Sequence, residues 1–355
     1  MTQSNRSFFF VSGYASVEQP GILSFSFNES TGEIRQVASY TGVNTPSFVI
    51  AHPNGKWLYA VSETGRDSHG ASGSVWSFRF ISEPFSIQPI NQQTSSGDWP
   101  CHLQLDATGS WLLATNYGTG NAALYPLQAD GSLSEITDFV QHQGRGLNAA
   151  RQEGPHAHSS IFTPDNRLAI IADLGIDQLV IYQFDQANGK LRPHSSVNTT
   201  PGAGPRHLVF HPNGKWLYTS NELNSTVSLY EYDSVNDTLV DKQNTPTIPS
   251  DSPENIVADI HIPDSGQRLY VSNRGHNSIA VYDIRPDGIL TLVNILTCGG
   301  NWPRNFALSR SGQFLLVANQ YSNEVCVLPI REGAEALGAP VARVAVTGAS
   351  CVQFI

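Results

Sequence analysis

The octapeptide HPNGKWLY occurs twice in this 355-residue chain, at residues 52–59 and at residues 211–218. In both copies an apolar segment runs into an Asn-Gly turn, and a second apolar segment follows the turn. An Asn-Gly pair between two apolar segments predicts a β-hairpin. Weaker copies of the pattern are LDATGSWLLATN (105–116), FTPDNRLAIIAD (162–173), IPDSGQRLYVSN (262–273) and LSRSGQFLLVAN (308–319). The hairpin is therefore a repeated unit of this chain.

The repeat has the length of a propeller blade. The second apolar segment of each copy ends in a polar residue, and these residues follow one another at intervals of roughly 50 positions. A third strand pattern comes next, for example GSVWSFRF (73–80) and STVSLYEYD (225–233), and a more irregular fourth follows it. Four strands in each unit are typical of a β-propeller. The second segments end at Glu63, Asn116, Asp173, Asn221, Asn273 and Asn319.

The two ends of the chain supply a seventh unit. SFFFVSGY (7–14) resembles a second strand without its first, and GASCVQFI (348–355) resembles a first strand without its second. Pairing the two segments closes the ring and removes an exposed sheet edge. Apolar spacing typical of a helix is not found. We therefore predict an all-β fold, a single seven-bladed β-propeller domain over residues 1–355. Its blades are four-stranded and antiparallel, and the N- and C-terminal strands pair within one blade.

The composition limits the partners and the compartment. The chain has a formal net charge of −10 and a pI of about 5.5, which argues against nucleic acid or an anionic membrane surface as a partner. Its four cysteines are scattered without a metal-binding spacing, as expected of reduced thiols. Neither a signal peptide nor an apolar stretch of the roughly 20 residues that span a membrane is evident. We expect a cytoplasmic protein, either a monomer or a weak homo-oligomer.

Hairpin geometry gathers polar residues at one end of the blades. The residue before a first strand lies beside the residue after the second strand of the same hairpin. The polar residues that precede first strands are His102, His156, His158, Arg206, His207, Glu254, Asn255, Arg304 and Asn305. Those that follow second strands are Glu63, Asn116, Tyr117, Asp173, Asn221, Glu222, Asn273, Arg274, Asn319 and Gln320.

Some of these residues have ordinary structural reasons to be there. Asn and Asp end strands through hydrogen bonds to the backbone, which explains Asn116, Asp173 and Asn221. Such a reason is missing for five others, and an arginine near a buried axis indicates an anion as its partner. These five candidates for a function are His158, Arg206, Glu222, Arg274 and Arg304. His52 and His211 begin turns at the far end of the blades, where we expect a structural role.

The two histidines of GPHAHSS (154–160) allow more than one interpretation. His156 and His158 are two positions apart, so an extended strand presents both on one face. They are candidate metal ligands, catalytic groups or structural imidazoles, and His156 alone also suits a local cap. A third metal ligand at a normal spacing is not evident. The chain has no HExxH, Walker or dinucleotide motif and no serine-nucleophile elbow. We therefore expect no metal and no cofactor.

Four stretches resemble a known family. They are GPHAHSS (154–160), GPRHLVFHPNGKWLYTSNELNSTV (204–227), LYVSNRGHNSIAVY (269–282) and WPRNFALSRSGQFLLVANQ (302–320). They are similar to the seven-bladed propeller lactonases, which include bacterial propeller-type 6-phosphogluconolactonases and fungal carboxy-cis,cis-muconate cyclases. The resemblance implies a metal-independent site in a central cleft. The His, Arg, Glu and Arg proposed for the cyclases correspond to His158, Arg206, Glu222 and Arg274.

The resemblance implies hydrolysis of 6-phospho-D-glucono-1,5-lactone to 6-phosphogluconate, a reaction of the pentose phosphate pathway. For this chemistry His158 or Glu222 is the candidate base, and Arg206 and Arg274 are candidates for holding the oxyanion or the phosphate. The further candidates for substrate binding are His156, His207, Arg304, Asn319, Gln320 and Tyr117. Two alternatives stay open. One is a lactone-forming or lactone-hydrolysing enzyme of the carboxymuconate cyclase type, and the other is a non-catalytic ligand-binding or scaffold propeller.

Overall fold

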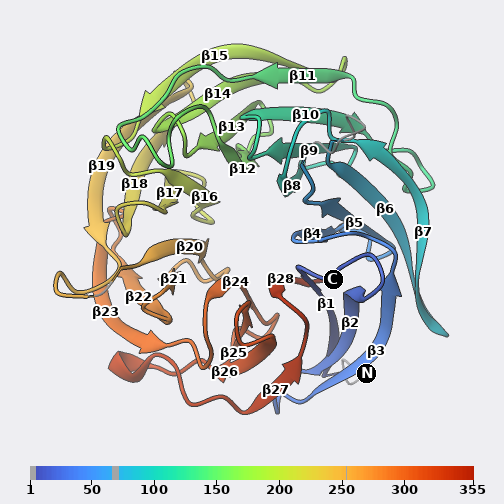
Figure 1. Cartoon of the computed structure of the whole chain (residues 1–355). Coiled ribbons are helices and arrows are strands. Elements are labelled where there is room, and N and C mark those ends of the chain that lie inside the picture. The colour runs from blue at the N-terminus through green and yellow to red at the C-terminus, as the bar shows by residue number, and fades with distance from the viewer. Residues whose placement is uncertain (1–4, 66–71, 253) are drawn as a thin grey trace.

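The computed structural model describes residues 5–65, 72–252 and 254–355. Seven four-stranded antiparallel sheets stand in a closed ring around a central axis (Figure 1). The predicted seven-bladed all-β architecture is therefore confirmed. The helical structure assigned within the described residues is a short 3-10 turn, η1 (Gly333–Glu335).

We number the blades from the one that contains the N-terminal strand. Blade 1 contains β28 (Ala349–Phe354), β1 (Arg6–Gly13), β2 (Pro20–Asn28) and β3 (Ile34–Thr41). Blade 2 contains β4 (Val49–Ala51), β5 (Trp57–Ser62), β6 (Ser74–Ser82) and β7 (Phe85–Thr94). Blade 3 contains β8 (Pro100–Leu105), β9 (Trp111–Asn116), β10 (Asn121–Pro126) and β11 (Asp138–Gln141). Blade 4 contains β12 (Ala157–Phe162), β13 (Leu168–Asp173), β14 (Gln178–Asp185) and β15 (Lys190–Asn198).

The last three blades follow the same order. Blade 5 contains β16 (Pro205–Phe210), β17 (Trp216–Asn221), β18 (Thr226–Asp233) and β19 (Thr238–Pro246). Blade 6 contains β20 (Ile256–His261), β21 (Arg268–Arg274), β22 (Ser278–Ile284) and β23 (Leu290–Thr297). Blade 7 contains β24 (Pro303–Leu308), β25 (Phe314–Asn319), β26 (Glu324–Pro329) and β27 (Ala342–Ala345). The first strand of each list lies nearest the axis (Figure 1).

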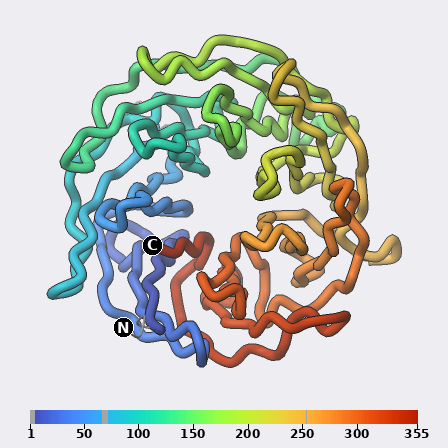
Figure 2. Tube along the Cα trace, turned by 180° about the vertical axis from the view of Figure 1, so that it is seen from behind, coloured from blue at the N-terminus to red at the C-terminus, as the bar shows by residue number. Residues whose placement is uncertain are grey.

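The chain ends close the ring as predicted. In blade 1 the inner strand β28 pairs antiparallel with β1, with Phe9 opposite Phe354 and Val11 opposite Val352. The red C-terminal strand accordingly lies beside the blue N-terminal segment in Figure 2. Closure gives blade 1 its inner strand, so β1 is paired on both sides and is not left as an exposed sheet edge.

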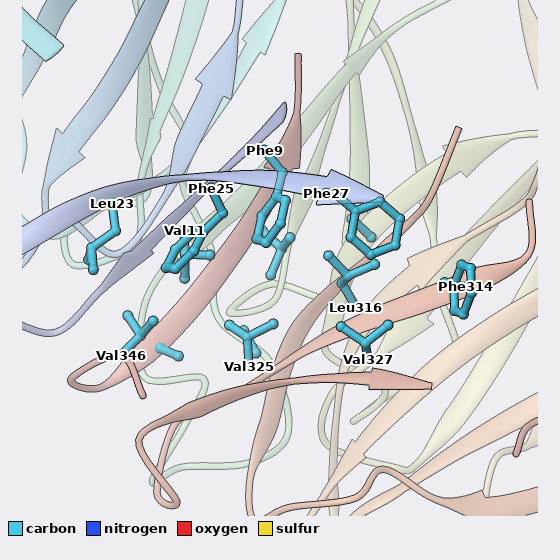
Figure 3. Close-up of a cluster of buried hydrophobic side chains, with 14 residues drawn as sticks. Phe9, Val11, Leu23, Phe25, Phe27, Phe314, Leu316, Val325, Val327 and Val346 are labelled. Carbon is cyan, nitrogen blue, oxygen red and sulfur yellow. The ribbon is translucent and has the colours of Figure 1, made fainter. Parts of the chain in front are cut away.

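The core lies between neighbouring blades. At the closure, Phe9, Phe25 and Phe27 of blade 1 pack against Phe314 and Leu316 of blade 7 (Figure 3). The rings of Phe9 and Phe25 stack with their centroids 5.1 Å apart, and Phe27 meets Phe314 edge to face at 5.6 Å. Each blade thus buries one face of its sheet against the next blade, which holds the inner strands at fixed positions around the axis.

The repeated octapeptide forms the turn at the far end of the blades. Gly55 and Gly214 have a φ of +71°, the left-handed region that the turn requires. His52 accepts a hydrogen bond from Asn54 N at Nδ1, so its Nε2 carries the hydrogen and donates to Gly109 O of the next blade at 2.9 Å. His211 makes the equivalent bond to Gly266 O at 2.9 Å. These contacts show a structural role for both histidines.

Candidate active site

A β-bulge brings several of the predicted site residues to the axis. On four inner strands one extra residue interrupts the pairing with the second strand, and these residues are Cys101, His158, Arg206 and Arg304. A bulge bends the strand and re-aims its side chain, and bulges are frequent next to active sites. Three of the five candidates therefore occupy equivalent positions in blades 4, 5 and 7.

The other two candidates come from the ends of second strands, as the hairpin geometry predicted. Glu222 directly follows β17, and Arg274 is the last residue of β21. The bulge residue Arg206 lies next to Pro205, which pairs with Asn221, so it stands beside Glu222. In blade 6, Ile256 at the start of the inner strand pairs with Arg274 itself.

Glu222 is the centre of a buried ion-pair network. Its Oε2 accepts from Arg206 Nε at 3.0 Å and from Arg274 Nη2 at 2.6 Å. The side chains of all three residues are at most 4% exposed. His158 Nε2 lies 4.0 Å from the same carboxylate oxygen. One carboxylate therefore connects side chains from blades 4, 5 and 6.

Arg151 completes this network and was missed by the sequence analysis. It lies in the segment between β11 and β12, where its Nη2 donates to Glu222 Oε1 at 2.5 Å and to Tyr117 Oη at 3.3 Å. Its side chain is 36% exposed, so it covers the network from the solvent side. Gln152 braces the segment with bonds from its Nε2 to Leu174 O and Asp177 Oδ1. This segment has no counterpart in the hairpin repeat, which gave no signal for it.

The aromatic side of the site consists of Tyr117 and two histidines. Tyr117 stacks on His156 with a centroid distance of 4.5 Å and meets His158 edge to face at 5.5 Å. His156 Nδ1 lies 2.8 Å from Tyr117 O, so this ring nitrogen donates to a backbone carbonyl. The contacts place Tyr117, His156 and His158 in one cluster. They show no metal-ligand geometry, and within the described ranges no group of three His, Cys, Asp or Glu side chains is placed to hold a metal.

Within the described residues Arg304 forms no ion pair with Glu222, but it is close enough to act on the network through its charge. Its guanidinium carbon is 5.0 Å from the centroid of the Tyr14 ring, and Tyr14 Oη donates to Glu63 Oε2 at 2.8 Å. The charge of Arg304 nevertheless contributes to the lowered pKa values of Arg206, Arg274 and His158. Tyr14 and Glu63 are further residues of this region, and Tyr14 was not among the candidates.

His207 lies behind the Glu222 network, with its ring 5.4 Å from that of His158, whereas Asn319 and Gln320 lie in other surroundings. His207 Nδ1 is 2.7 Å from Asp259 Oδ1, one residue further along the inner strands than the bulges. Asn319 Nδ2 faces Cys326 Sγ at 3.4 Å within blade 7. Gln320 N donates to Trp302 O, while its buried Oε1 lacks a hydrogen-bond partner in the described structure. The contacts of Asn319 match those of a strand end, like Asn116 and Asn221, which bond to neighbouring backbone or hydroxyl groups.

The electrostatics give the site an excess of positive charge. Burial alone would raise the pKa of Glu222, but Arg274, Arg206 and Arg151 outweigh burial and hold that pKa far below its usual range. Burial, together with Arg274 and Arg304, lowers the pKa of Arg206 to about 9, so Arg206 stays charged at neutral pH. Burial and the neighbouring arginines keep the pKa of His158 well below its usual value, so this imidazole is neutral.

Two N–H donors of the arginine network are unpaired. Arg206 Nη1 and Arg274 Nε are buried and have no hydrogen-bond partner in the described part of the chain. A buried unpaired donor costs roughly 1–3 kcal/mol, so such groups call for an explanation. Several guanidiniums around one carboxylate, with donors left over, are the arrangement expected of a site for an anionic ligand.

A large hollow on the described surface lies elsewhere. It has a volume of about 870 Å³ and opens on the face that carries the hairpin turns of blades 6 and 7. The arginines along it are already engaged: Arg268 donates to two backbone carbonyls, Arg310 to Ile355 O, and Arg331 pairs with Glu335. We therefore place the site by its chemistry, at the opposite end of the blades. In the described residues no helix has the length and apolar character needed to cross a membrane.

Comparison with known proteins agrees with this geometry. Residues 8–354 match the family described as "Lactonase, 7-bladed beta-propeller". The chain belongs to this family. The lactonase is 35% identical to a 6-phosphogluconolactonase of Formosa agariphila over 313 residues, which covers 86% of this chain and 87% of the relative. It is 30% identical to the 6-phosphogluconolactonase of Bacillus subtilis over 348 residues, 98% of this chain and 97% of that protein.

A solved structure shows the same architecture. The periplasmic gluconolactonase of Pseudomonas aeruginosa superposes on the lactonase with a TM-score of 0.92 at 28% identity, covering 99% of each chain. The predicted family and the assignment as a lactone-hydrolysing enzyme are thus confirmed, and a scaffold propeller without activity is not the interpretation that these relatives favour.

Proposed function

We propose that the lactonase hydrolyses 6-phospho-D-glucono-1,5-lactone to 6-phosphogluconate, as a cytoplasmic enzyme of the pentose phosphate pathway. Two relatives at 30% and 35% identity carry the name of this activity. The observation that carries the proposal in this chain is the surplus of buried positive charge around Glu222. A single carboxylate faces the guanidiniums of Arg151, Arg206 and Arg274, and two of their N–H donors remain unpaired.

The anionic substrate would complete this charge balance. Arginine presents a planar set of donors that matches the oxygens of a phosphate. Arg304 adds a further positive charge near the network, and its guanidinium lies over the Tyr14 ring. In this proposal Arg206 and Arg274 contact the lactone carbonyl oxygen or the phosphate, and Arg304 attracts the phosphate. Tyr117, His156 and Gln320 remain candidates for contacts with the sugar hydroxyls, whereas Asn319 is fully buried in its strand-end contacts.

Hydrolysis itself needs a donor for an oxyanion and an acceptor for a proton. Water adds to the lactone carbonyl carbon, negative charge develops on the carbonyl oxygen, and the ring C–O bond then breaks. The unpaired N–H groups of Arg206 and Arg274 suit the developing oxyanion, because donors in a buried site stabilise it without reorganisation. Because three guanidiniums hold Glu222 as an anion, it is a weak base, and we assign it to organising the arginines.

His158 then remains the catalytic imidazole in contact with the network. Its Nε2 faces Glu222 Oε2 at 4.0 Å, and its Nδ1 faces Cys101 Sγ at 3.8 Å. The neutral ring is able to donate a hydrogen bond to the substrate or to accept a proton from water. A lactone is an activated ester, so positioned polar groups of this kind are chemically sufficient.

The experiment compares substrates that differ in charge. Purified protein is added to freshly prepared 6-phosphoglucono-1,5-lactone, to glucono-1,5-lactone and to a carboxylated lactone of aromatic degradation, and acid release is followed at constant pH. The proposal expects kcat/KM for the phosphorylated lactone to exceed that for gluconolactone by about 100-fold, the worth of one charge-assisted contact. Equal rates for the two would overturn it, and a preference for the carboxylated lactone would favour the cyclase-type alternative.

The proposal also includes the organisation of the protein. We keep residues 1–355 as one domain, active as a monomer or weak homo-oligomer without nucleic acid or membrane partners. Size-exclusion chromatography with light scattering measures the oligomeric state, and activity in a cytosolic fraction tests the compartment.

A further inference from the structure

A second layer of polar side chains lies behind the arginine network. It is formed by the inner-strand residues that directly follow the bulges, His102, His207 and Asn305, together with Asp259 of β20. Their side chains are buried, and the His207 ring lies 5.4 Å from the ring of His102 and 5.4 Å from that of His158. Because His207 is adjacent to Arg206 in sequence and to His158 in space, this layer borders the candidate active site.

Asp259 is the hub of the second layer. Its Oδ1 lies 2.7 Å from His207 Nδ1, and its Oδ2 lies 2.8 Å from His261 Nε2. The same Oδ2 accepts from Asn305 Nδ2 at 2.5 Å and from the backbone N of Phe306 at 3.1 Å. With four donors on two oxygens, this carboxylate is fully satisfied although the residue is only 2% exposed.

These contacts determine the tautomer of His207. The charge of His261, together with the hydrogen bonds from His207 and His261, outweighs burial and keeps the pKa of Asp259 well below its usual value, so Asp259 is ionised and only accepts. The hydrogen of His207 must therefore be on Nδ1, and the lone pair is on Nε2. His158 has no carboxylate at its Nδ1, and His102 Nδ1 faces Ser160 N at 3.4 Å. His207 is therefore the imidazole of this region that a buried carboxylate orients, whereas His156 Nε2 lies 3.3 Å from Glu153, whose side chain is 62% exposed.

We propose that His207 accepts the proton of the attacking water and that Asp259 is the positioning residue that holds His207 in the accepting tautomer. The inference rests on the proposed lactone hydrolysis and gives His158 the role of a hydrogen-bonding contact to the substrate. The arrangement follows the logic of a base oriented by a third group, here without a protein nucleophile.

The proton that the attacking water loses is taken up and later returned by His207, with Asp259 beside it. As the water oxygen bonds to the carbonyl carbon, one water proton moves to His207 Nε2, and the imidazolium that forms is stabilised by Asp259. When the ring C–O bond breaks, His207 returns the proton to the leaving ring oxygen and is neutral again. Burial and Arg206 lower the pKa of His207 to about 4, against the opposing effect of Asp259, so the ring is in its accepting form at neutral pH. The other charged or titratable groups facing it are His102, His158 and His261.

The test is Asp259→Asn, which keeps the shape of the side chain and removes the charge. We expect kcat for 6-phosphogluconolactone to fall by about 100-fold or more, with KM within about threefold of the wild type. The acid limb of the pH profile of kcat/KM should move to lower pH, because the carboxylate that raised the pKa of His207 is gone. In wild-type protein, ¹⁵N NMR should show His207 protonated at Nδ1, and in the variant this preference should be lost.

Asp106→Asn is the matched control. Asp106 is also a carboxylate only 2% exposed and accepts several hydrogen bonds, but it lies in the hairpin turn of blade 3, at the far end of the blades. We expect the kcat of this variant to stay within about threefold of the wild type. An equal loss in both variants would show that Asp259 only supports the fold and would overturn the inference, as would an unchanged kcat in Asp259→Asn.

His207→Gln covers the case in which Asp259→Asn does not fold. The amide of Gln is able to donate to Asp259 but is not a base, so a fall in kcat of about 100-fold is expected and wild-type turnover would overturn the inference. The two proposals fail in different ways. Wild-type protein that hydrolyses no lactone refutes the proposed function, whereas an active wild type with a fully active His207→Gln refutes only the role of His207.

Discussion

Arg206 and Glu222 of blade 5 form a buried ion pair, with Arg206 Nε 3.0 Å from Glu222 Oε2. The same oxygen accepts from Arg274 of blade 6, and the other oxygen accepts from Arg151 of the segment that precedes blade 4. The carboxylate therefore joins three separate parts of the ring at the place where the substrate is proposed to bind. Stability and activity should respond together when this carboxylate is altered.

Glu222→Gln should destabilise the fold. The amide keeps the shape of the side chain but leaves Arg206 and Arg274 buried without a counterion, and breaking one half of a buried pair typically costs about 3–5 kcal/mol. Urea unfolding at pH 7 measures the loss. Arg192→Gln is the matched control, since Arg192 is 65% exposed in its pair with Asp185 and should change stability by less than about 1 kcal/mol. A Glu222→Gln variant as stable as this control would contradict the buried network.

The stability difference between wild type and Glu222→Gln should depend on pH in one direction. In the folded protein the pKa of Glu222 is depressed below its usual 4.5. The contribution of the ionised carboxylate to the free energy of unfolding is therefore fully present above pH 4.5 and is lost as the pH falls towards the folded pKa. We expect the free energies of unfolding of wild type and Glu222→Gln to differ by a constant amount between pH 5 and pH 8. Below about pH 4.5 this difference should become smaller. Urea midpoints at half-unit intervals of pH measure this, and a difference that widens on acidification would reverse the assigned sign.

The sequence was sufficient for the ring and for part of the site. The hairpin repeat gave the inner and second strands, and pairing their ends predicted that Arg206, Glu222 and Arg274 lie together. The hairpin repeat did not predict Arg151, because that residue lies in a segment unique to one blade. The other repeats have no equivalent position with which it could be compared. Nor did the hairpin repeat predict Asp259: in an apolar strand, side chains alternate between the faces, and only the bulge of β20 reveals which way this carboxylate points.

The position of Arg304 illustrates the same limit. Like His158 and Arg206, Arg304 precedes a first strand, so the sequence analysis grouped the three residues as candidates at one end of the blades. In the structure its guanidinium lies over Tyr14, which directly follows the N-terminal strand β1. Tyr14 belongs to blade 1, where the chain ends close the ring, and it is about 290 positions from Arg304 in the sequence. A local sequence pattern therefore does not predict this contact.

Arg151→Met should weaken substrate binding with little effect on the fold. The Arg151 side chain is 36% exposed, so its loss should change the free energy of unfolding by less than about 1 kcal/mol. It is also the guanidinium nearest to solvent in the network, so we expect KM for the phosphorylated lactone to rise by about tenfold. Steady-state kinetics measure the change, and Arg145→Met in the same segment is the control. An unchanged KM would show that Arg151 serves Glu222 alone.

Deletion of residues 351–355 should open the ring. The inner strand β28 would lose most of its pairing with β1, and the buried side chains of Cys351 and Val352 would be removed. Burial of these apolar groups and the strand contributes several kcal/mol at about 25 cal/mol per Å². Thermal unfolding followed by circular dichroism measures the loss. Deletion of Ile355 alone, which leaves β28 (Ala349–Phe354) intact, is the control, and equal melting temperatures for the two deletions would contradict closure by this strand.

Arg274→Ala and Arg274→Lys together test whether the site binds its substrate through a planar set of donors. The Arg274 guanidinium bonds Glu222 Oε2 at 2.6 Å and Val257 O at 2.9 Å, and its Nε remains unpaired. A charge-assisted hydrogen bond in a sheltered cleft contributes about 1.5–3 kcal/mol, so Arg274→Ala should lower kcat/KM by about 10- to 150-fold. Lysine restores the charge but has no Nε donor in a planar fork, so Arg274→Lys should recover only part of this loss. Circular dichroism must show both variants folded, because each also disturbs the Glu222 network. Full activity in Arg274→Lys would mean that charge alone matters, and the unpaired Nε would then have no part in binding the substrate.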